Sequence, residues 1–505
     1  MIDKRVAFRD YAPDLPRLVN PGLTDAKNMR PKAGGWYPAR GLANLANATA
    51  LSARPQGALS GTNNSGSGFQ VAGDATKLYV FTDTGMTDRS RTPGYSLGQK
   101  DRWAFAQFGN EVYAATRNED MQFVKLGSTD VWADVAENAP RARHLAVASN
   151  KFLVAGNIID ADGVFPNAIS WSARNAPRNW PTVGSDAAVS VQSDRQVLEG
   201  DSGPVQDIVT GADVTAVFRE RSIHRMDEVN GDKIFLIPEV DNQHGMLVPY
   251  SGVAFGRSIF YIASDGFRIF DYTQSSNIGK DRVDRTFMDD LDQDFLDRVW
   301  TAKDPDQTVI WILYPGSGNV SGRPNKLLLW DFALDKWSNG EIDAEALIEN
   351  VTETPASLDA PENLPTDPMD LDDPGTGPAS FDDRLTGSGN SRMGAFDTGF
   401  VSSDFTGAKL EGLAETGDIE LIPGRRSCTQ HIRPMVSRRE ARVSVATRPR
   451  TQDDLGLFSA VVAQDSTGKC SIRKEGRYHS FRVELPAGWD DAIGFDVYAT
   501  PSGNR

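Results

Sequence analysis

The fold is decided by stretches such as Val309-Ile310-Trp311-Ile312-Leu313, which is followed by Lys326-Leu327-Leu328-Leu329-Trp330. Both runs have the length of a strand and are rich in aliphatic and aromatic residues, so they predict strands rather than helices. The glycine-rich Gly316-Ser317-Gly318 between them is typical of a loop, because no helix pattern follows it. The three segments together predict a β-hairpin.

The same pattern of two short apolar runs around a turn recurs from about residue 68 to about residue 340. The second runs centre at roughly 80, 113, 153, 217, 260 and 312, a spacing that scatters around the 40 to 50 residues of propeller blades. Hairpins repeated radially leave only short exposed edges. We therefore expect a mainly β chain with a β-propeller-like domain of about six irregular blades over residues 61–340. Two packed β-sandwiches remain the alternative.

The flanking segments have other patterns. Residues 1–60 are punctuated by prolines and predict an extended N-terminal arm. Residues 341–404 are acidic and Pro-rich, with no Lys or Arg between Lys336 and Arg384, and predict a solvated linker or insertion. Residues 405–505 return to alternating strand patterns and predict a C-terminal antiparallel β-sandwich domain. Only residues 284–297 have helical periodicity, and we expect a helix there, inserted between blades.

The overall charge limits what the chain binds. Its 505 residues have a formal net charge of −16, whereas a protein that grips nucleic acid needs Lys and Arg to displace phosphate counterions. An acidic wall would instead repel DNA, as a conduit requires. No apolar signal-peptide region follows Met1, and no apolar run approaches the roughly 20 residues that span a bilayer. The two cysteines, Cys428 and Cys470, cannot make a disulfide framework, so we expect synthesis in a reducing cytoplasm.

Motifs for metal chemistry each lack a required residue. Asp290, Asp292 and Asp294 suggest a calcium loop, but its sixth and twelfth positions, which need Gly and Glu, hold Phe295 and Thr301. We interpret the acidic residues as a polar helix face.

One further set of side chains, in the last domain, has the residue types of a zinc site. It consists of Cys428, His431, Cys470 and His479. The second pair is spaced too widely for a usual zinc knuckle, and an extended chain would point Cys428 and His431 to opposite faces. The chain has neither a GxSxG elbow nor a Walker loop. We therefore predict no catalytic residue, no metal ligand and no cofactor.

Arginines are concentrated in the last domain, and they suggest a docking surface for an acidic neighbour. The alternative is an ordinary solvated face. The candidate assembly residues comprise these arginines and acidic residues of the 341–383 segment, which an adjacent copy could supply. They are Arg425, Arg426, Arg438, Arg439, Asp370, Asp372 and Asp373.

Short elements spread over nearly the whole chain form an ordered set. They are Asn20-Pro21-Gly22-Leu23, Gly34-Gly35-Trp36-x-Pro38, Ile169-Ser170-Trp171-Ser172 with Trp180, the run from Val217 to Met226, Asp265-Gly266-Phe267-x-x-Phe270, Ile278-Gly279-x-Asp281-x-Val283-Asp284, Leu328-Leu329-Trp330-Asp331 with Asp335-x-Trp337-Ser338, Gly476-Arg477-Tyr478-His479 and Pro486-Ala487-Gly488. In this order they resemble the tail hub or nozzle proteins of short-tailed bacteriophages, a family also described as packaged-DNA stabilisation proteins or tail tubular protein B-like. The ordered set is much more specific than any one of its elements.

The resemblance implies a structural virion protein of the phage tail. Its expected form is a hexameric ring, assembled in the bacterial host cytoplasm, that extends the DNA channel below the portal and the head-to-tail adaptor. Such a ring would help to retain packaged DNA, let duplex DNA pass without specific binding, and anchor needle, spike or fibre proteins. Two alternatives stay open: a propeller enzyme, and a receptor-binding or polysaccharide-degrading tail spike or fibre.

Overall fold

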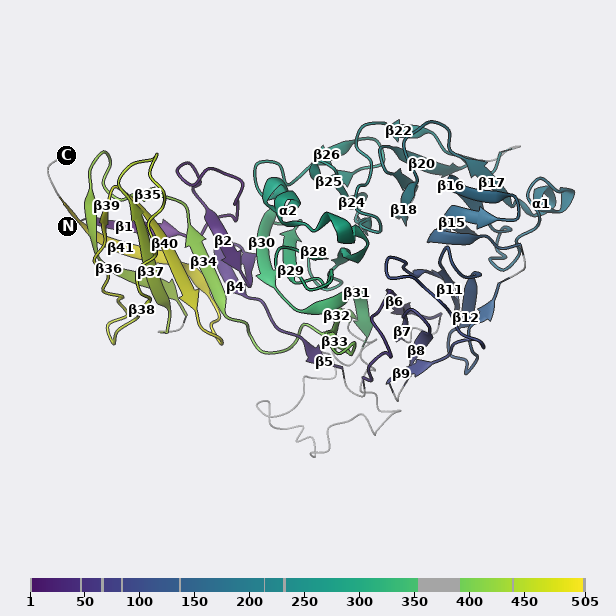
Figure 1. Cartoon of the computed structure of the whole chain (residues 1–505), viewed down its shortest axis with the longest axis horizontal. Coiled ribbons are helices and arrows are strands. Elements are labelled where there is room, and N and C mark those ends of the chain that lie inside the picture. Colours follow the sequence, from purple (N-terminus) through teal and green to yellow (C-terminus); the bar gives the residue numbers. More distant parts are fainter. Residues whose placement is uncertain are drawn as a thin grey trace, which may run out of the picture.

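The computed structural model of the chain describes residues 2–45, 48–64, 68–82, 85–135, 138–212, 214–229, 233–352, 391–437 and 440–502. Within these residues the protein is predominantly β, and seven four-stranded units follow one another along the middle of the chain. Figure 1 shows them around a ring at one end of an elongated molecule. The mainly β, propeller-like fold predicted from the sequence is therefore confirmed.

The first four blades come from residues 57–241. The first blade consists of β6 (Gly57–Thr62), β7 (Gly68–Gly73), β8 (Leu78–Thr82) and β9 (Gly85–Asp88), and the second of β10 (Ala104–Phe108), β11 (Glu111–Ala115), β12 (Gln122–Lys125) and β13 (Ala133–Asp134). The third blade consists of β14 (Arg141–Ala148), β15 (Phe152–Asp160), β16 (Gly163–Trp171) and β17 (Asp194–Val197). The fourth consists of β18 (Val205–Thr210), β19 (Thr215–Arg219), β20 (Ile223–Glu228) and β21 (Phe235–Leu236), with β22 (Glu239–Asp241) also on β20.

The last three blades complete the ring. They consist of β23 (Val253–Phe255), β24 (Ser258–Ala263), β25 (Gly266–Phe270) and β26 (Ser275–Asn277); β27 (Trp300–Lys303), β28 (Val309–Tyr314), β29 (Lys326–Asp331) and β30 (Lys336–Glu341); and β31 (Ala344–Thr352), β32 (Ser391–Asp397), β33 (Ser402–Asp404) and β5 (Ala43–Asn44). The first strand of each blade contacts the first strand of the next, and β31 contacts β6, so these seven strands surround a common axis.

The seventh blade differs from the sequence-based expectation of about six blades followed by a linker over 341–404. Strands β31 and β32 pair antiparallel, with Leu347 opposite Ala395. Leu347 and Ile348 of β31 and Met393 and Phe396 of β32 are buried. These apolar residues stand among acidic ones, and the low hydrophobicity of the segment hid the strand pattern. The acidic Glu345 is itself buried and is paired with Arg298 at 2.5 Å and with Arg323 at 2.8 Å.

Residues 2–45 of the N-terminal segment, which was expected to be an extended arm, instead contribute strands to three sheets. β5 pairs with β33, so residues 43–44 provide the outermost strand of the seventh blade. The strands before β5 belong to the sheets at the other end of the molecule. The propeller is thus inserted, along the chain, between two parts of a second β domain.

That second domain is a sandwich of two sheets. One sheet has the order β3-β4-β41-β36-β39, with β1 on β41; the other has β2-β34-β40-β37-β38, with β35 on β40. Their strands are β1 (Ile2–Ala7), β2 (Leu23–Lys27), β3 (Met29–Lys32), β4 (Gly35–Pro38), β34 (Gly412–Thr416), β35 (Ile419–Glu420), β36 (Ser427–Val436), β37 (Arg442–Arg448), β38 (Val462–Ala463), β39 (Glu475–Gly476), β40 (Tyr478–Leu485) and β41 (Ala492–Pro501). Phe481 and Phe495, one from each sheet, meet at 5.0 Å between ring centroids. Because β1 pairs with β41, the first and last strands of the chain lie side by side (Figure 1).

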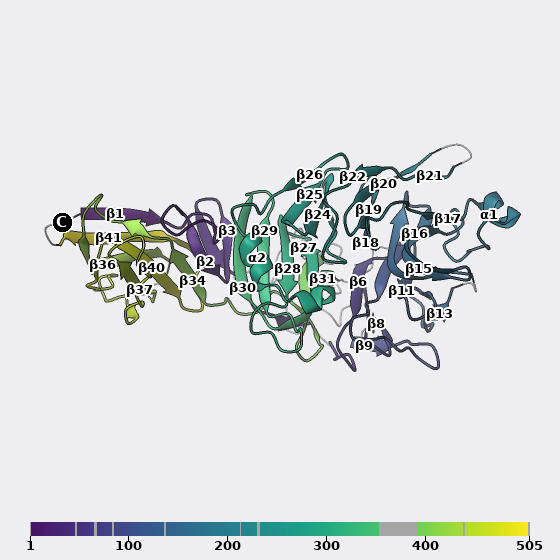
Figure 2. The ribbon, with the colours of Figure 1, turned by 45° about the horizontal axis from the view of Figure 1, so that its top comes forward.

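One sheet runs from the sixth blade into the sandwich. Strand β2 pairs parallel with β30 at Lys27 and Asn339, so the blade and the sandwich sheet form one ten-stranded sheet. Figure 2 shows β2 beside β30 between the two domains. A single cluster of buried apolar residues extends from Phe260 and Trp337 in the propeller to Phe481 in the sandwich.

Helices are short in the described residues. The expected helix over 284–297 is two pieces, α2 (Asp284–Asp290) and the 3₁₀-helix η1 (Gln293–Arg298), because Leu291 is extended and the Asp292 carboxylate accepts from the Asp294 amide at 3.1 Å. The sequence did not predict α1 (Asp186–Val191). No helix in this part of the chain combines the length and apolar character needed to cross a membrane.

We expect Trp337→Ala to destabilise the joint between the domains. The Trp337 ring is fully buried and packs against Phe267 at 4.9 Å and Trp330 at 5.9 Å between centroids. Its loss should lower the free energy of unfolding by about 4 kcal/mol, measured by urea denaturation. Val320→Ala, at an exposed position, is the control and should stay within about 0.5 kcal/mol of the wild type. If the Trp337→Ala protein were as stable as that control, the conclusion that the two domains share one core would be wrong.

Candidate functional site

The propeller has a polar cavity where the innermost strands begin. Its volume is about 440 Å³, and it lies at the ends of the first strands of blades two to six. The residues that line it are Lys100, Asp101, Arg102, Thr116, Arg117, Arg143, Gln206, Leu247, Pro249, Tyr250, Gln293, Asp294, Leu296 and Asp297. We call this the axial cavity. None of these residues was expected from the sequence to form a binding site.

The blade architecture explains why these side chains meet. Arg102 precedes β10, Arg143 lies at the start of β14, Gln206 lies at the start of β18, and Tyr250 precedes β23. Because the first strands of the blades run in the same direction around the axis, their beginnings converge on one face. Arg117 joins them because it follows β11, which runs antiparallel to β10.

Arg102 is the most enclosed cation of the axial cavity, with only 9% of its surface exposed. Its guanidinium lies 3.7 Å from the Trp300 ring centroid and 4.5 Å from that of Tyr250, in cation–π contacts. It donates to the backbone oxygen of Val299 at 3.1 Å. Burial lowers the pKa of Arg102 to about 10, so the side chain stays charged at neutral pH.

Arg143 and Tyr250 hold each other in place. The Arg143 Nε donates to the Tyr250 hydroxyl at 3.3 Å, and that hydroxyl donates to the Arg143 backbone oxygen at 3.1 Å. The Tyr250 backbone has φ 61, in the left-handed region that a bulky residue rarely adopts. Such strain persists where the surroundings fix it, as the two arginines around the Tyr250 ring do here.

A titratable pair lies beside the arginines. His144 is fully buried, and its Nδ1 is 3.8 Å from Oδ1 of Asp207. Burial lowers the pKa of His144 well below its ordinary value, so the imidazole is neutral at neutral pH. Burial also raises the pKa of Asp207 to about 6, although its carboxylate accepts from the amides of Ile208 at 2.9 Å and Gly252 at 3.1 Å.

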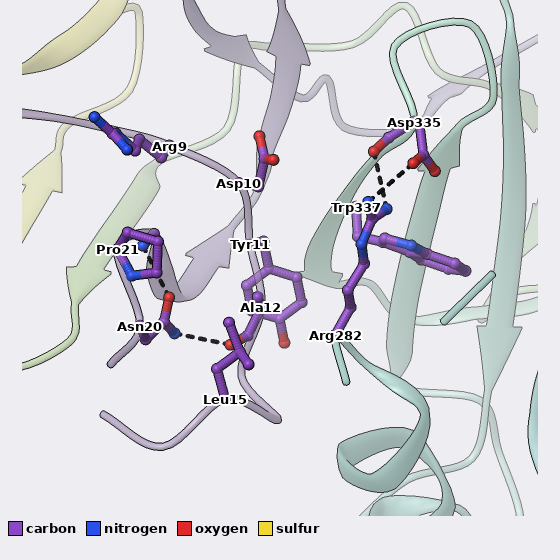
Figure 3. Close-up of a pocket in the computed structure, with 11 residues that line it drawn as sticks. Arg9, Asp10, Tyr11, Ala12, Leu15, Asn20, Pro21, Arg282, Asp335 and Trp337 are labelled. Atoms are coloured by element: carbon purple, nitrogen blue, oxygen red, sulfur yellow. Dashed lines mark hydrogen bonds and ion pairs between the residues drawn. The ribbon is translucent and has the colours of Figure 1, made fainter. Parts of the chain in front are cut away.

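A second cavity, of about 230 Å³, lies at the joint between the domains (Figure 3). Its polar groups largely satisfy one another: Asn20 donates to the Ala12 oxygen at 2.8 Å and accepts from the Gly22 amide at 2.8 Å. Arg282 donates to the Asp335 carboxylate at 2.9 Å. These contacts hold the N-terminal loop against the propeller and largely use up the polar groups of this joint cavity. The axial cavity is therefore the better candidate for a ligand.

The assembly candidates proposed from the sequence are only partly described. Arg425 and Arg426 are exposed in the turn before β36, and Arg426 lies 3.2 Å from Glu475 of the same sandwich. Arg438, Arg439, Asp370, Asp372 and Asp373 lie outside the described residues. A pairing between the two sets stays a prediction.

The cysteines and histidines of the sandwich make other contacts. His431 stacks on Tyr498 at 4.2 Å between centroids, and the buried His479 lies 3.0 Å from the Ser427 hydroxyl. Cys470 is buried, and burial raises the pKa of its thiol to about 12. Among the residues that the structure describes, no three His, Cys, Asp or Glu side chains are grouped to hold a metal.

Comparison with known proteins gives distant likenesses in fold. No family model and no curated protein matches the chain. Among solved structures, YCF48 bound to D1 peptide is similar with a TM-score of 0.35 and 12% identity, over 60% of this chain and 85% of that one. A domain assigned as the extracellular part of a one-component system from B. thetaiotaomicron has a TM-score of 0.30 and 9% identity, over 55% and 34%. The propeller is established by the strand pairing itself.

Asp207 should make stability depend on pH. Its folded pKa of about 6 lies above the roughly 3.9 of an unfolded Asp, so the protonated form favours folding. This contribution is complete below pH of about 4 and is lost as pH rises through about 6. Relative to the wild type, Asp207→Asn should therefore gain up to about 3 kcal/mol of unfolding free energy between these values and keep it above them.

Urea denaturation at pH values from about 4.5 to 7.5 measures this difference. Asp454→Asn removes the same charge at an exposed position and tests whether net charge alone is responsible. A constant difference between Asp207→Asn and the wild type across the range would disprove the role of burial.

Proposed function

We propose that this chain is a structural ring component of a short-tailed bacteriophage tail, a hub or nozzle that extends the DNA channel. The observation that supports the proposal is the ordered set of family-like elements from Asn20 to Gly488. In the structure these elements lie in the propeller blades, in the sandwich sheets and in the turns between their strands. Their side chains therefore fix the positions of strands and turns.

Two of these elements interlock in the fifth blade. The Asp284 carboxylate accepts from the Phe267 amide at 3.0 Å and from the Asn277 side chain at 2.9 Å. A Cβ atom at Gly266 would lie 2.1 Å from the Asp284 carboxyl carbon, and one at Gly279 would lie 2.0 Å from its oxygen. Only glycine leaves room for the carboxylate at both positions, so the spacing of the motif has a structural cause.

Another of these elements, from Leu328 to Ser338, lies at the joint between the domains. Asp335 accepts from the Trp330 indole at 3.3 Å and binds Arg282, so the turn between β29 and β30 is fixed. The buried Arg219 of the fourth-blade element likewise donates to three backbone oxygens, those of Glu199, Gly200 and Gly203. These contacts make the turns rigid. Rigid turns suit the wall of a DNA channel better than they suit a mobile catalytic loop.

In the proposed assembly, six copies form a closed ring below the portal and the head-to-tail adaptor. Closed symmetry would bury surfaces that are exposed in one chain. The net charge of −16 would make the bore repulsive to duplex DNA, which then passes without adhering. Needle, spike or fibre proteins would attach below, and the protein would be located in the virion tail.

The second candidate is a receptor-binding or polysaccharide-degrading tail spike or fibre. The observation that favours it is the axial cavity, because ligand sites are commonly concave pockets of a few hundred Å³ that contain convergent polar groups. The number of copies and their place in the tail separate the two candidates.

We expect a reconstruction of purified particles of the phage that encodes this chain to place six copies in a ring between the adaptor and the distal tail. The quantity measured is the symmetry and position of density that fits the propeller and sandwich. Quantitative mass spectrometry of the same particles provides the copy number independently. Three copies in a distal appendage would favour the spike, and absence of the chain from purified particles would refute both candidates.

A further inference from the structure

The cations of the axial cavity are not held in salt bridges, although the nearby Asp297 and Asp207 carboxylates partly offset the lowering of the Arg102 pKa by burial. Lys100 donates to the backbone oxygen of Asp294 at 2.9 Å, and Arg102 donates to backbone oxygens. Arg143 is bonded to Tyr250, and the buried Nε of Arg117 has no hydrogen-bond partner among the described residues. In the described part of the chain, none of these four cations forms an ion pair with a carboxylate.

Further donors and acceptors at the cavity lack partners. Gln206 is only 9% exposed, and its side-chain oxygen is buried without a hydrogen bond. The Nε groups of Arg102 and Arg117 are buried and unpartnered as well. Buried polar groups in native proteins are nearly always satisfied, so this concentration around one hollow indicates a group that comes from outside the chain.

The carboxylates of the cavity restrict what that group is. Asp101 is occupied by its own loop, since it accepts from the Gly98 amide at 2.7 Å and binds Asn118. Asp294 and Asp297 also line the cavity, and they would repel a long polyanion such as duplex DNA. A single compact oxyanion can contact the arginines without approaching every carboxylate. Guanidinium groups match such oxyanions through paired N–H donors.

We propose that the axial cavity binds a small molecule through a single oxyanion group, either a phosphate or a carboxylate, held by Arg117 and Arg143, while a donor group of the same molecule meets the Gln206 side-chain oxygen. Arg102 supplies fixed positive charge below them, held in place by the rings of Trp300 and Tyr250. The volume of about 440 Å³ admits a compact metabolite-sized ligand. This assignment concerns the propeller alone and does not depend on the tail-ring proposal.

The test is calorimetric titration of the full chain with inorganic phosphate and, separately, with succinate, at constant ionic strength. We expect one site per chain with a dissociation constant below about 10 mM for at least one of the two probes. Binding of phosphate alone identifies a phosphate site, binding of succinate alone identifies a carboxylate site, and binding of both identifies a general oxyanion site. Each of these results supports the proposal.

Matched variants locate the site. Arg117→Gln and Arg143→Gln should each weaken binding by about tenfold or more, because each removes a charged donor. Arg473→Gln removes the same charge at an exposed position of the sandwich and should leave the affinity unchanged. Circular dichroism of each variant confirms that it is folded. The proposal is overturned if neither probe binds the folded wild type, or if Arg473→Gln weakens binding as much as the cavity variants do.

Discussion

The parallel contact between β2 and β30 is the constraint on which the rest of the structure depends. Asn339 accepts from the Ala26 amide at 2.9 Å and donates to Asp25 at 2.8 Å, so its side chain bonds to the sandwich while its strand belongs to the sixth blade. Asn28, at φ 56, accepts from the Glu341 amide at 3.2 Å. These contacts make one sheet of two domains and bring the N-terminal segment to the place from which β5 reaches the seventh blade.

The closed ring follows from that placement. A propeller must join its last blade to its first, and here β31 contacts β6 while β5 provides the outer strand of the last blade. Residues 43–44 therefore link the end of the ring to the segment that enters it. The chain begins in the sandwich, passes around the propeller and returns to the sandwich, where β1 pairs with β41. Both ends of the propeller are thereby held by the sandwich.

The sequence predicted the blades whose strands are apolar throughout, such as β28, because their burial on both faces leaves an unmistakable run. It missed the seventh blade because Glu345 and its neighbours give an acidic composition that resembles a linker, and the burial of Glu345 depends on Arg298 and Arg323 from elsewhere in the chain. The role of residues 1–45 was missed for a related reason, since short strands around prolines pair only with distant partners. Strand patterns are local, whereas these pairings are not.

The axial cavity shows the same limit for a site. Arg102, Arg117 and Arg143 stand at strand ends in the sequence, where charged residues are usually solvated, and nothing local distinguishes them from the arginines of the last domain. What distinguishes them is convergence: the ring turns equivalent positions of successive blades toward one axis. The arginines of the last domain were predicted to be assembly residues because they are dense in the sequence. In the structure, Arg426 is exposed and lies beside a glutamate of its own sheet. In a propeller, the closed ring brings together the residues that adjoin the first strand of each blade, however far apart they lie in the chain. A binding site is therefore expected among these residues rather than where charges are dense in the sequence.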